Sequence, residues 1–363
     1  AGTIFVTSLT GMNSQFELNL VMTVLLGLVL VYTILGGMVA VVITDYFQFV
    51  VLSFGMLAAC AFAVNELGWS NIVNTVVEEQ GQAGFNPFHG EGFGSGYVVW
   101  MIFLGLVSCA VWQTAVMRAC SAVDVQTVKR VYAWSSIGFL IRFLIPNFIG
   151  ICAFVYFARD DALRAVYLAE DAESTTTLAA MPVFLSQVLP VGVIGIIAAG
   201  LLAAFMSTHD SYLLCWSSVL TQDVVAPLMG DNLSTRARLL ITRCLIAAIG
   251  VFLLVWSLWY PLEQDMWDYM AITGAVYFTG AFALLLFGIY WKRASRTGAY
   301  LALSCGFVAI FGLKSVQDAL SFSIPVEFVG LATVGLCIFS MVIGSLVFPD
   351  TETDATTQTG SHA

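Results

Sequence analysis

Long apolar runs separated by short polar connections dominate this chain of 363 residues. Each run holds about 20 residues, and an α-helix of that length crosses a hydrocarbon core about 30 Å thick. A backbone in lipid must satisfy its own hydrogen bonds, and the runs lack the alternation of a membrane β-barrel, so they predict helices. We predict about nine transmembrane helices, at residues 18–37, 40–64, 97–118, 131–157, 190–217, 237–259, 268–291, 298–316 and 326–348.

Composition agrees with this pattern. Hydrophobic residues make up 60% of the chain and charged residues 10%, whereas soluble domains hold roughly half and a quarter. The chain is therefore predicted to be an all-α, multi-pass membrane protein in contact with a lipid bilayer. Much of the net charge of −10 lies in two long connections, 65–96 and 158–189. We interpret their acidic side chains as a solvated face.

Lysine and arginine positions predict the orientation, because short cytoplasmic loops retain positive charge. If residues 18–37 run inward, the outside connections hold only Arg159, Arg164 and Lys314. The inside connections then hold Arg118, Lys129, Arg130, Arg236, Arg238, Arg243, Lys292, Arg293 and Arg296. This bias predicts a protein of the cell (inner or plasma) membrane with a cytoplasmic C-terminus, where residues 349–363 form a polar, disordered tail.

Several classes of function leave no trace in the sequence. The eight cysteines lie in or beside apolar runs without a Cys-x-x-Cys pair, and the three histidines are scattered, so neither zinc ligands nor a disulfide framework is predicted. The chain also lacks a Walker loop, a Rossmann glycine fingerprint and a nucleophile elbow. We therefore expect no enzyme, no organic cofactor and no nucleic-acid partner.

Polar groups at membrane depth are the informative feature, because they are costly there. The run GIIAAGLLAAFMSTHDSYLLCWSSVL, residues 195–220, is interrupted by five polar side chains. Helical spacing places residues 204, 207, 208 and 211 on one face, so that the Ala204 carbonyl and the Ser207, Thr208 and Ser211 hydroxyls form a column. Such a column suits a hard cation, although the hydroxyls alternatively bond back to carbonyls one turn earlier.

A second polar stretch, YTILGGMVAVVITDYFQ, spans residues 32–48. Gly36 and Gly37 break the apolar run, and Asp45 lies in the first turns of the next predicted helix. A carboxylate near a helix N-terminus is favoured by the helix dipole. The alternative interpretation places Asp45 at the mouth of a cation path.

These stretches resemble the sodium/solute symporter family. The family pattern Tyr-Thr-x-x-Gly-Gly, continuing to Thr-Asp-x-x-Gln, fits residues 32–48, and LPVGVIGIIAAGLLAAFMSTHDS, residues 189–211, is similar to the family's Met-Ser-Thr-x-Asp-Ser helix. MRACSAVD, residues 117–124, resembles a cytoplasmic motif, with Met117 in place of Gln and Cys120 in place of Leu. GIYWKRASRTGA, residues 288–299, resembles the family's Trp-Lys-Arg-x-x-x-x-Gly-Ala pattern. The matches are collinear and cover residues 1 to about 300.

The resemblance implies a leucine-transporter-like fold of two inverted five-helix repeats, each with one broken helix near the midplane. Residues 1–64 would end the first repeat, beginning with the tail of the third core helix. An extracellular loop, 65–96, would lead to the second repeat at 97–291 and two peripheral helices at 292–348. Counted in this way, the fold is N-terminally incomplete, and the missing helices would be required to complete the site.

Carried over to this chain, the principal sodium site comprises Ala204, Ser207 and Thr208. A second cation, sodium or a proton, would lie among Asp45, Asp210 and Ser211, because two carboxylates in a low dielectric repel unless a cation separates them or one is protonated. Gly36, Gly37 and Arg142 are assigned structural or gating roles. His209 points away from the hydroxyl face and is expected to be packed or hydrogen-bonded.

The predicted function is sodium-coupled symport of a small organic solute by alternating access, with sodium as the coupling ion. The alternatives are a transporter-like solute sensor and a passive solute channel. Candidate residues of the substrate pocket lie on the sixth and tenth core helices: Ser108, Trp112, Gln113, Tyr269, Thr273 and Tyr277.

Overall fold

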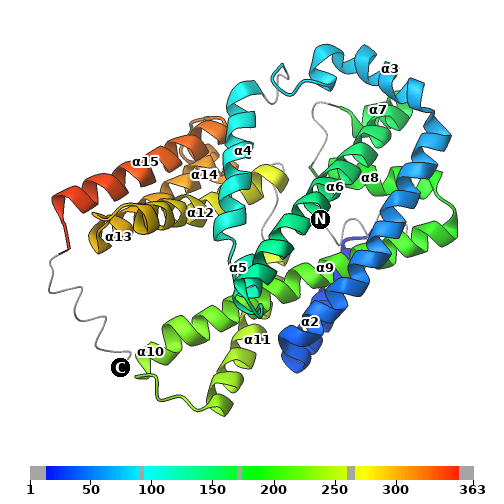
Figure 1. Cartoon of the computed structure of the whole chain (residues 1–363). Helices are drawn as coiled ribbons and strands as arrows, with labels where there is room; N and C mark the ends of the chain where they lie inside the picture. Colours follow the sequence, from blue (N-terminus) through cyan, green and yellow to red (C-terminus); the bar gives the residue numbers. More distant parts are fainter. Residues whose placement is uncertain (1–13, 90–93, 170–173, 260–265, 351–363) are drawn as a thin grey trace. The chain divides into compact units, whose positions relative to one another are not determined.

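The computed structural model describes residues 14–89, 94–169, 174–259 and 266–350, and the regular elements within these ranges are all helical (Figure 1). Eight segments are long and apolar enough to cross a membrane: Asn19–Val39, Val41–Leu67, Gly94–Cys120, Val125–Ala158, Val191–Leu228, Thr235–Trp259, Met266–Tyr290 and Val326–Val347. They correspond to eight of the nine predicted spans. Residues 1–13, where the tail of the third core helix is expected, and most of the predicted tail at 349–363 lie outside the described residues.

The ninth predicted span, 298–316, is built differently from the others. α13 (Arg296–Cys305) passes into a 3-10 helix, η3 (Gly306–Gly312), and α14 (Lys314–Ala319) follows. A 3-10 helix rises about 2.0 Å per residue against about 1.5 Å in an α-helix, so residues 296–312 reach roughly 29 Å. The segment has fewer residues than the predicted span but nearly the length of a hydrocarbon core.

Two compact units divide the chain. The first unit contains α2 (Gln15–Leu67), α3 (Trp69–Gln80), α6 (Val125–Ala158), α7 (Asp161–Tyr167), α8 (Ser174–Val188), α9 (Val191–Val219), a π-helical stretch (Leu220–Val225), α10 (Ala226–Leu228) and α11 (Thr235–Trp259). The second unit contains α4 (Gly94–Val111), α12 (Met266–Tyr290), α13, η3, α14 and α15 (Val326–Val347). α5 (Gln113–Cys120) crosses from the second unit to the first. This division follows packing, so the assignment to repeats stays a prediction.

α2 holds two predicted spans, 18–37 and 40–64, and Gly37 separates them. Gly37 has φ 59° and ψ −161° and interrupts the helical backbone. This region of φ/ψ space is essentially open only to glycine. The predicted break at Gly36 and Gly37 therefore has a physical cause at the second glycine.

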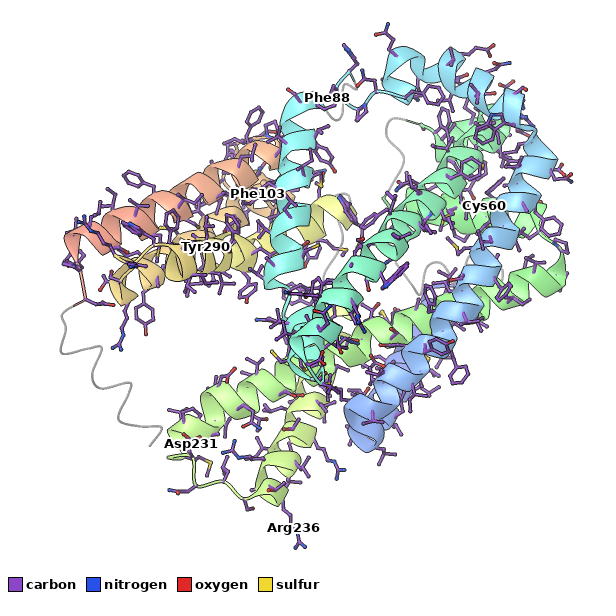
Figure 2. The ribbon with its side chains drawn as sticks, in the orientation of Figure 1. Cys60, Phe88, Phe103, Asp231, Arg236 and Tyr290 are labelled. Atoms are coloured by element: carbon purple, nitrogen blue, oxygen red, sulfur yellow. The ribbon has the colours of Figure 1, made fainter. Side chains whose placement is uncertain are left out.

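The packing of α2 against α9 positions the candidate site in the first unit. The two backbones approach closely at Gly200, where a Cβ atom would lie 3.1 Å from the Leu52 Cα. A larger apolar cluster joins α2, α6, α8 and α9, and Cys60 of α2 packs against it (Figure 2). A smaller one joins α2, α9 and α11 through Val29, Leu213 and Ile246.

In the second unit, α12 packs against α4, α13, η3 and α15. Phe103 of α4 meets Phe282 of α12 edge-on, with ring centroids 5.3 Å apart (Figure 2). Trp100 is fully buried next to Gly330 of α15, where a Cβ atom would lie 2.6 Å from the indole ring. The indole ring therefore fills the space that a side chain at residue 330 would need.

Both acidic connections contain short helices. Residues 65–96 contain α3 and a 3-10 turn, Gly81–Gly84, while 158–189 contains α7 and α8. Arg164 of α7 and Glu79 of α3 form a two-point ion pair, at 2.9 and 2.5 Å. The side chain of Asp160 caps α7 by accepting from the Ala162 N–H at 2.9 Å.

Candidate cation-binding site

The predicted hydroxyl column lies on α9. Pro190 precedes the helix, and the apolar residues that follow continue it through the polar positions. The Thr208 Oγ1 donates to the Ala204 carbonyl oxygen at 2.9 Å, and the Ser211 Oγ donates to the Ser207 carbonyl oxygen at 2.7 Å. Ala204 and Ser207 are half-buried, Thr208 is exposed and Ser211 is buried. These bonds join the Thr208 hydroxyl to the Ala204 carbonyl and the Ser211 hydroxyl to the Ser207 carbonyl, and the Ser207 hydroxyl takes part in neither.

These bonds have two interpretations. Serine and threonine in apolar helices commonly donate to the carbonyl one turn earlier, which satisfies the hydroxyl locally. The same geometry places the Thr208 hydroxyl next to the Ala204 carbonyl, so that two of the predicted sodium ligands are neighbours. The residue types fit a hard cation. Sodium binding by Ala204, Ser207 and Thr208 stays a prediction.

Asp210 is fully buried. Its Oδ2 accepts a hydrogen bond from the Tyr32 hydroxyl of α2, and its Oδ1 lies 3.2 Å from the Ser211 Oγ. The Tyr32 hydroxyl also lies 3.2 Å from the Met206 carbonyl oxygen. The carboxyl group that the sequence left without a partner thus faces a tyrosine from another helix.

Asp45 has a different partner. Its Oδ2 lies 3.1 Å from the Nη2 of Arg118, at the end of α5. The same nitrogen lies 2.6 Å from the Ser211 Oγ of α9. One guanidinium nitrogen therefore joins α2, α5 and α9, within a single compact unit.

Two buried acceptor atoms on this part of α2 remain unused within the described residues. The Asp45 Oδ1 and the Gln48 Oε1 are buried atoms without a hydrogen-bond partner. Residues 45 and 48 are three positions apart on α2, so both side chains lie on one helix face. This face offers oxygen atoms to a donor or a cation.

Tyr32 and Arg118 were not among the predicted site residues. Arg118 counted in the sequence only as a cytoplasmic positive charge, and Tyr32 only as part of a family pattern. Both belong to the stretches that resemble the family, and that resemblance was the available signal. Composition and helical spacing give no signal for these two residues, because each lies far in sequence from the group that it contacts.

The candidate substrate residues belong to the second unit or its border. The helix breaks at Trp112, between α4 and α5, and the Ser108 carbonyl accepts from the Trp112 N–H at 2.9 Å. α4 meets α12 at two levels. Tyr97 contacts Asp268 at 3.5 Å, and farther along Val107 and Val111 cluster with Ala281. Ser108 and Trp112 thus lie one or more helical turns beyond Tyr269, Thr273 and Tyr277, and the structure does not show these six residues in one pocket.

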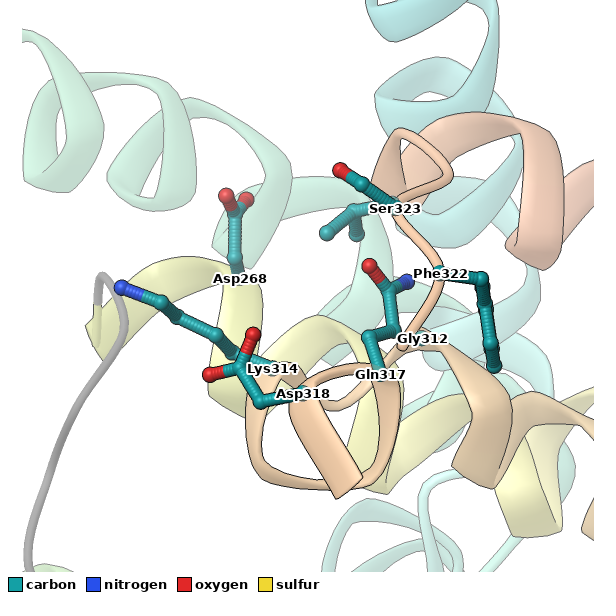
Figure 3. A pocket seen from close by; sticks show the side chains of 8 residues that line it. Asp268, Gly312, Lys314, Gln317, Asp318, Phe322 and Ser323 are labelled. Carbon is teal, nitrogen blue, oxygen red and sulfur yellow. The ribbon is translucent and has the colours of Figure 1, made fainter. Parts of the chain in front are cut away.

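A cavity of about 250 Å³ lies elsewhere in the second unit (Figure 3). Asp268 at the start of α12 faces Lys314 and Asp318 of α14 across it. Gln317 also lines the cavity, but its side-chain nitrogen already donates to the backbone carbonyls of Phe311 and Ile324, both at 2.9 Å. None of the predicted substrate residues lines this cavity.

Two other predicted positions have defined surroundings. The His209 Nδ1 bonds the Phe205 carbonyl oxygen at 2.8 Å and its ring packs on Phe205, which confirms the expected packed and hydrogen-bonded position. The Arg142 guanidinium lies 5.3 Å from the Phe139 ring centroid in a cation–π contact. Arg142 is exposed on α6, and no ion pair within the described residues includes it. Its structural or gating role stays a prediction.

Comparison with known proteins supports one family. A sodium/proline symporter of Haemophilus influenzae is 26% identical over 79% of this chain and 56% of its own length. A sodium/sialic acid symporter of Proteus mirabilis is 25% identical over 82% and 60%, and a human sodium/myo-inositol cotransporter is 25% identical over 89% and 48%. The chain thus spans about half the length of these curated relatives.

The fold is shared with a solved structure, and a family model matches the sequence. A solved structure of a substrate-bound, outward-open Na⁺-coupled sialic acid symporter, described as revealing a novel Na⁺ site, matches with a TM-score of 0.74 at 20% identity. The match covers 96% of this chain and 71% of that chain. The model of the sodium:solute symporter family matches residues 1–306. With its apolar helices, this chain is a multi-pass membrane protein that belongs to the sodium:solute symporter family.

Proposed function

We propose that the protein couples the sodium gradient to the uptake of a small organic solute across the cell membrane, by alternating access. The observation that carries this proposal is the polar column of α9, where the Ala204 carbonyl and the Thr208 hydroxyl lie 2.9 Å apart at membrane depth. Ser207 lies on the same helix face. These three residues bind the principal sodium ion, and no covalent chemistry is involved.

The break at Trp112 supports the solute half of the proposal. The helical backbone is irregular at Trp112, although the Trp112 N–H still bonds the Ser108 carbonyl at 2.9 Å. Substrate sites of related transporter folds lie beside such irregular transmembrane helices. Ser108, Trp112 and Gln113 surround that break. In the proposal these residues contact the solute, and Tyr269, Thr273 and Tyr277 of α12 contribute to its pocket.

The orientation follows from positive charge. Arg118 ends α5, while Lys129 and Arg130 begin α6, and Arg236 and Arg238 begin α11. Asp231 lies in the bend between α10 and α11, and Arg236 lies in the first turn of α11 (Figure 2). Asp231 pairs with Arg238 at 3.7 Å. We infer that these ends, and the C-terminus, are cytoplasmic.

Uptake into proteoliposomes distinguishes the proposal from its alternatives. The full-length protein is reconstituted, and radiolabelled amino acids, carboxylates and polyols are supplied with an inward sodium gradient or with an equal potassium gradient. Symport requires uptake above the external concentration with sodium only. Uptake that stops at equal concentrations in both gradients would show a passive channel. Solute binding without uptake would favour a sensor.

Two substitutions test the sodium ligands. Ser207→Ala and Thr208→Ala each remove one oxygen, and the sodium concentration for half-maximal uptake should rise about tenfold or more, since loss of about 1.4 kcal/mol in binding is a factor of ten. Ser186→Ala is the matched control, because the Ser186 hydroxyl bonds the Val183 carbonyl of its own helix, α8, at 2.7 Å. Unchanged sodium dependence in both site variants would contradict the assignment.

A further inference from the structure

The turn between α12 and α13 presents a group of positive charges. The Ala294 N–H donates to the Trp291 carbonyl oxygen at 3.0 Å, so Lys292 and Arg293 are the two central residues of a tight turn. Both side chains are exposed, and no ion pair within the described residues includes either one. Arg296, the first residue of α13, is exposed as well. Three cations thus lie close together in sequence, without an acidic residue between them.

Buried contacts hold this turn in place. Ser295 is 3% exposed, and its N–H donates to the Ser345 Oγ of α15 at 3.0 Å. The backbones of α13 and α15 approach closely there, since a Cβ atom at Gly344 would lie 2.8 Å from the Gly298 Cα. The backbone that carries the cations is therefore fixed before an anion binds, which lowers the entropic cost of binding.

Asp350 is an acidic residue that contacts this connection. It follows α15, and both of its carboxylate oxygens lie 3.2 Å from the Arg296 backbone nitrogen, whose N–H they accept. The first N–H group of α13 is satisfied in this way. An external anion would therefore be bound by the side chains of Lys292 and Arg293 at the tip of the turn, and not by the helix N-terminus.

Exposed aromatic side chains flank the cations. Tyr290, the last residue of α12, is 81% exposed (Figure 2). Tyr300, one helical turn beyond Arg296 in α13, is 71% exposed. Tyrosine is enriched at the level of lipid headgroups, because its ring is apolar and its hydroxyl is polar. The membrane span Met266–Tyr290 ends directly before the turn, so the cations lie where phosphate groups of lipids are found.

Positive charge alone does not distinguish this turn, because cytoplasmic connections are generally basic. The start of α11 offers a comparison. Arg236 and Arg243 are exposed there, but Arg238 between them pairs with Asp231, and residues 235–251 contain no aromatic side chain. The turn between α12 and α13 differs because it combines adjacent cations, a buried support and aromatic neighbours.

We propose that this turn binds the headgroup of an anionic phospholipid, with the lipid phosphate against Lys292 and Arg293 and the aromatic rings of Tyr290 and Tyr300 beside the lipid. The occupant is a lipid because the turn lies at the end of a membrane span, between aromatic residues. The inference goes beyond the proposed function, since neither sodium nor the solute takes part. It uses only the proposed orientation, which places the turn at the anionic cytoplasmic leaflet.

The test compares two lipids. Purified full-length protein in detergent is titrated with phosphatidylglycerol or with phosphatidylcholine, and bound lipid is counted by native mass spectrometry. The wild type should bind phosphatidylglycerol at least tenfold more tightly. Lys292→Gln with Arg293→Gln should weaken that binding about tenfold or more, because each basic side chain near an anionic surface contributes about 1 kcal/mol. Lys292→Arg with Arg293→Lys keeps both charges and should bind like the wild type.

Arg236→Gln with Arg243→Gln is the matched control, because it removes two exposed cations from α11 and should leave lipid binding unchanged. Equal losses in the two glutamine variants would show non-specific attraction and overturn the inference. A wild type that binds both lipids equally would overturn it without any variant.

Free anions are tested by competition at constant ionic strength. Inorganic phosphate should not displace phosphatidylglycerol, and displacement would show a site for free anions instead of a lipid. Lipid binding is measured without sodium or solute. A failure of sodium-coupled uptake therefore remains distinguishable from a failure of this inference.

Discussion

Asp210 and Tyr32 illustrate how single residues are satisfied inside this membrane protein. Asp210 is fully buried, and a buried carboxyl group without hydrogen bonds is costly. The Tyr32 hydroxyl meets that need from another helix, 178 positions away in sequence. This pair also links α2 to α9 beside the candidate sodium ligands, so its contribution to stability should be measurable.

Tyr32→Phe removes the hydroxyl and leaves the ring. The buried Asp210 then loses a donor, and the free energy of unfolding should fall by about 1–3 kcal/mol. The measurement is equilibrium denaturation of the purified protein in mixed micelles. Tyr300→Phe is the control, because Tyr300 is exposed on α13. Equal stabilities of the two variants would show that the Tyr32 bond contributes nothing.

Arg118 shows the same dependence on distant partners with a charged group. It lies 73 positions from Asp45 and 93 from Ser211 along the chain. The sequence singled out the two carboxylates and the hydroxyls as polar groups within apolar spans. It did not identify the cation that meets Asp45, because that requires knowing which helix end faces α2 and α9.

At the scale of helices, one glycine decides where α2 is interrupted. The backbone at Gly37 has φ 59° and ψ −161°, and a Cβ atom there would meet no neighbour within 4 Å. Backbone conformation is therefore the reason that glycine is needed, and crowding is not.

Gly37→Ala should consequently destabilise the protein by about 1–3 kcal/mol through backbone strain. Gly27→Ala is a sharp comparison, since Gly27 lies in the helical part of α2 and also has no neighbour within 4 Å of a Cβ atom. That change should be neutral or stabilising by up to about 1 kcal/mol. Denaturation midpoints of the two variants give the answer, and equal effects would exclude strain at Gly37.

The ion pair between α3 and α7 links two acidic connections. Hydrogen bonding from Arg164, opposed by slight desolvation and aided by its charge, lowers the pKa of Glu79. A carboxyl group whose pKa is lowered on folding stabilises the folded state above its unfolded pKa. That stabilisation is lost as the pH falls through the lowered pKa.

Glu79→Gln should therefore reduce the melting temperature at neutral pH and have no effect in acid, where the wild-type carboxyl group is protonated as well. Both side chains are partly exposed, so high salt should also reduce the difference. Glu78→Gln is the control, because Glu78 is exposed and no ion pair within the described residues includes it. A difference that persists at acid pH would contradict the ion-pair origin.

For the whole molecule, hydropathy predicted most spans well. Eight of the nine predicted spans correspond to helices of sufficient length, because the requirement to cross about 30 Å of hydrocarbon acts on each segment separately. The segment 298–316 differs because Gly306 begins a 3-10 helix, which reaches nearly the same length with fewer residues. Apolar content does not distinguish an α-helix from a 3-10 helix.

The division into two compact units was outside the reach of the sequence. Residues 82–116 pack with the C-terminal helices, while α2 packs with α9 and α11. A linear assignment to consecutive repeats describes helix order and does not state which helices bury each other. The family resemblance implied one broken helix in each repeat without placing a break at Trp112, and hydropathy predicted a continuous span at 97–118.

The sequence by itself determined that this is a helical membrane protein with a column of oxygen atoms on one helix, because hydropathy and the helical period are local properties. It also carried the motifs that identify the sodium:solute symporter family. Only the tertiary structure decided the partners of the charged groups: Tyr32 for Asp210, and Arg118 for Asp45. Burial makes an unpaired charge costly, but the choice of partner depends on how distant helices pack.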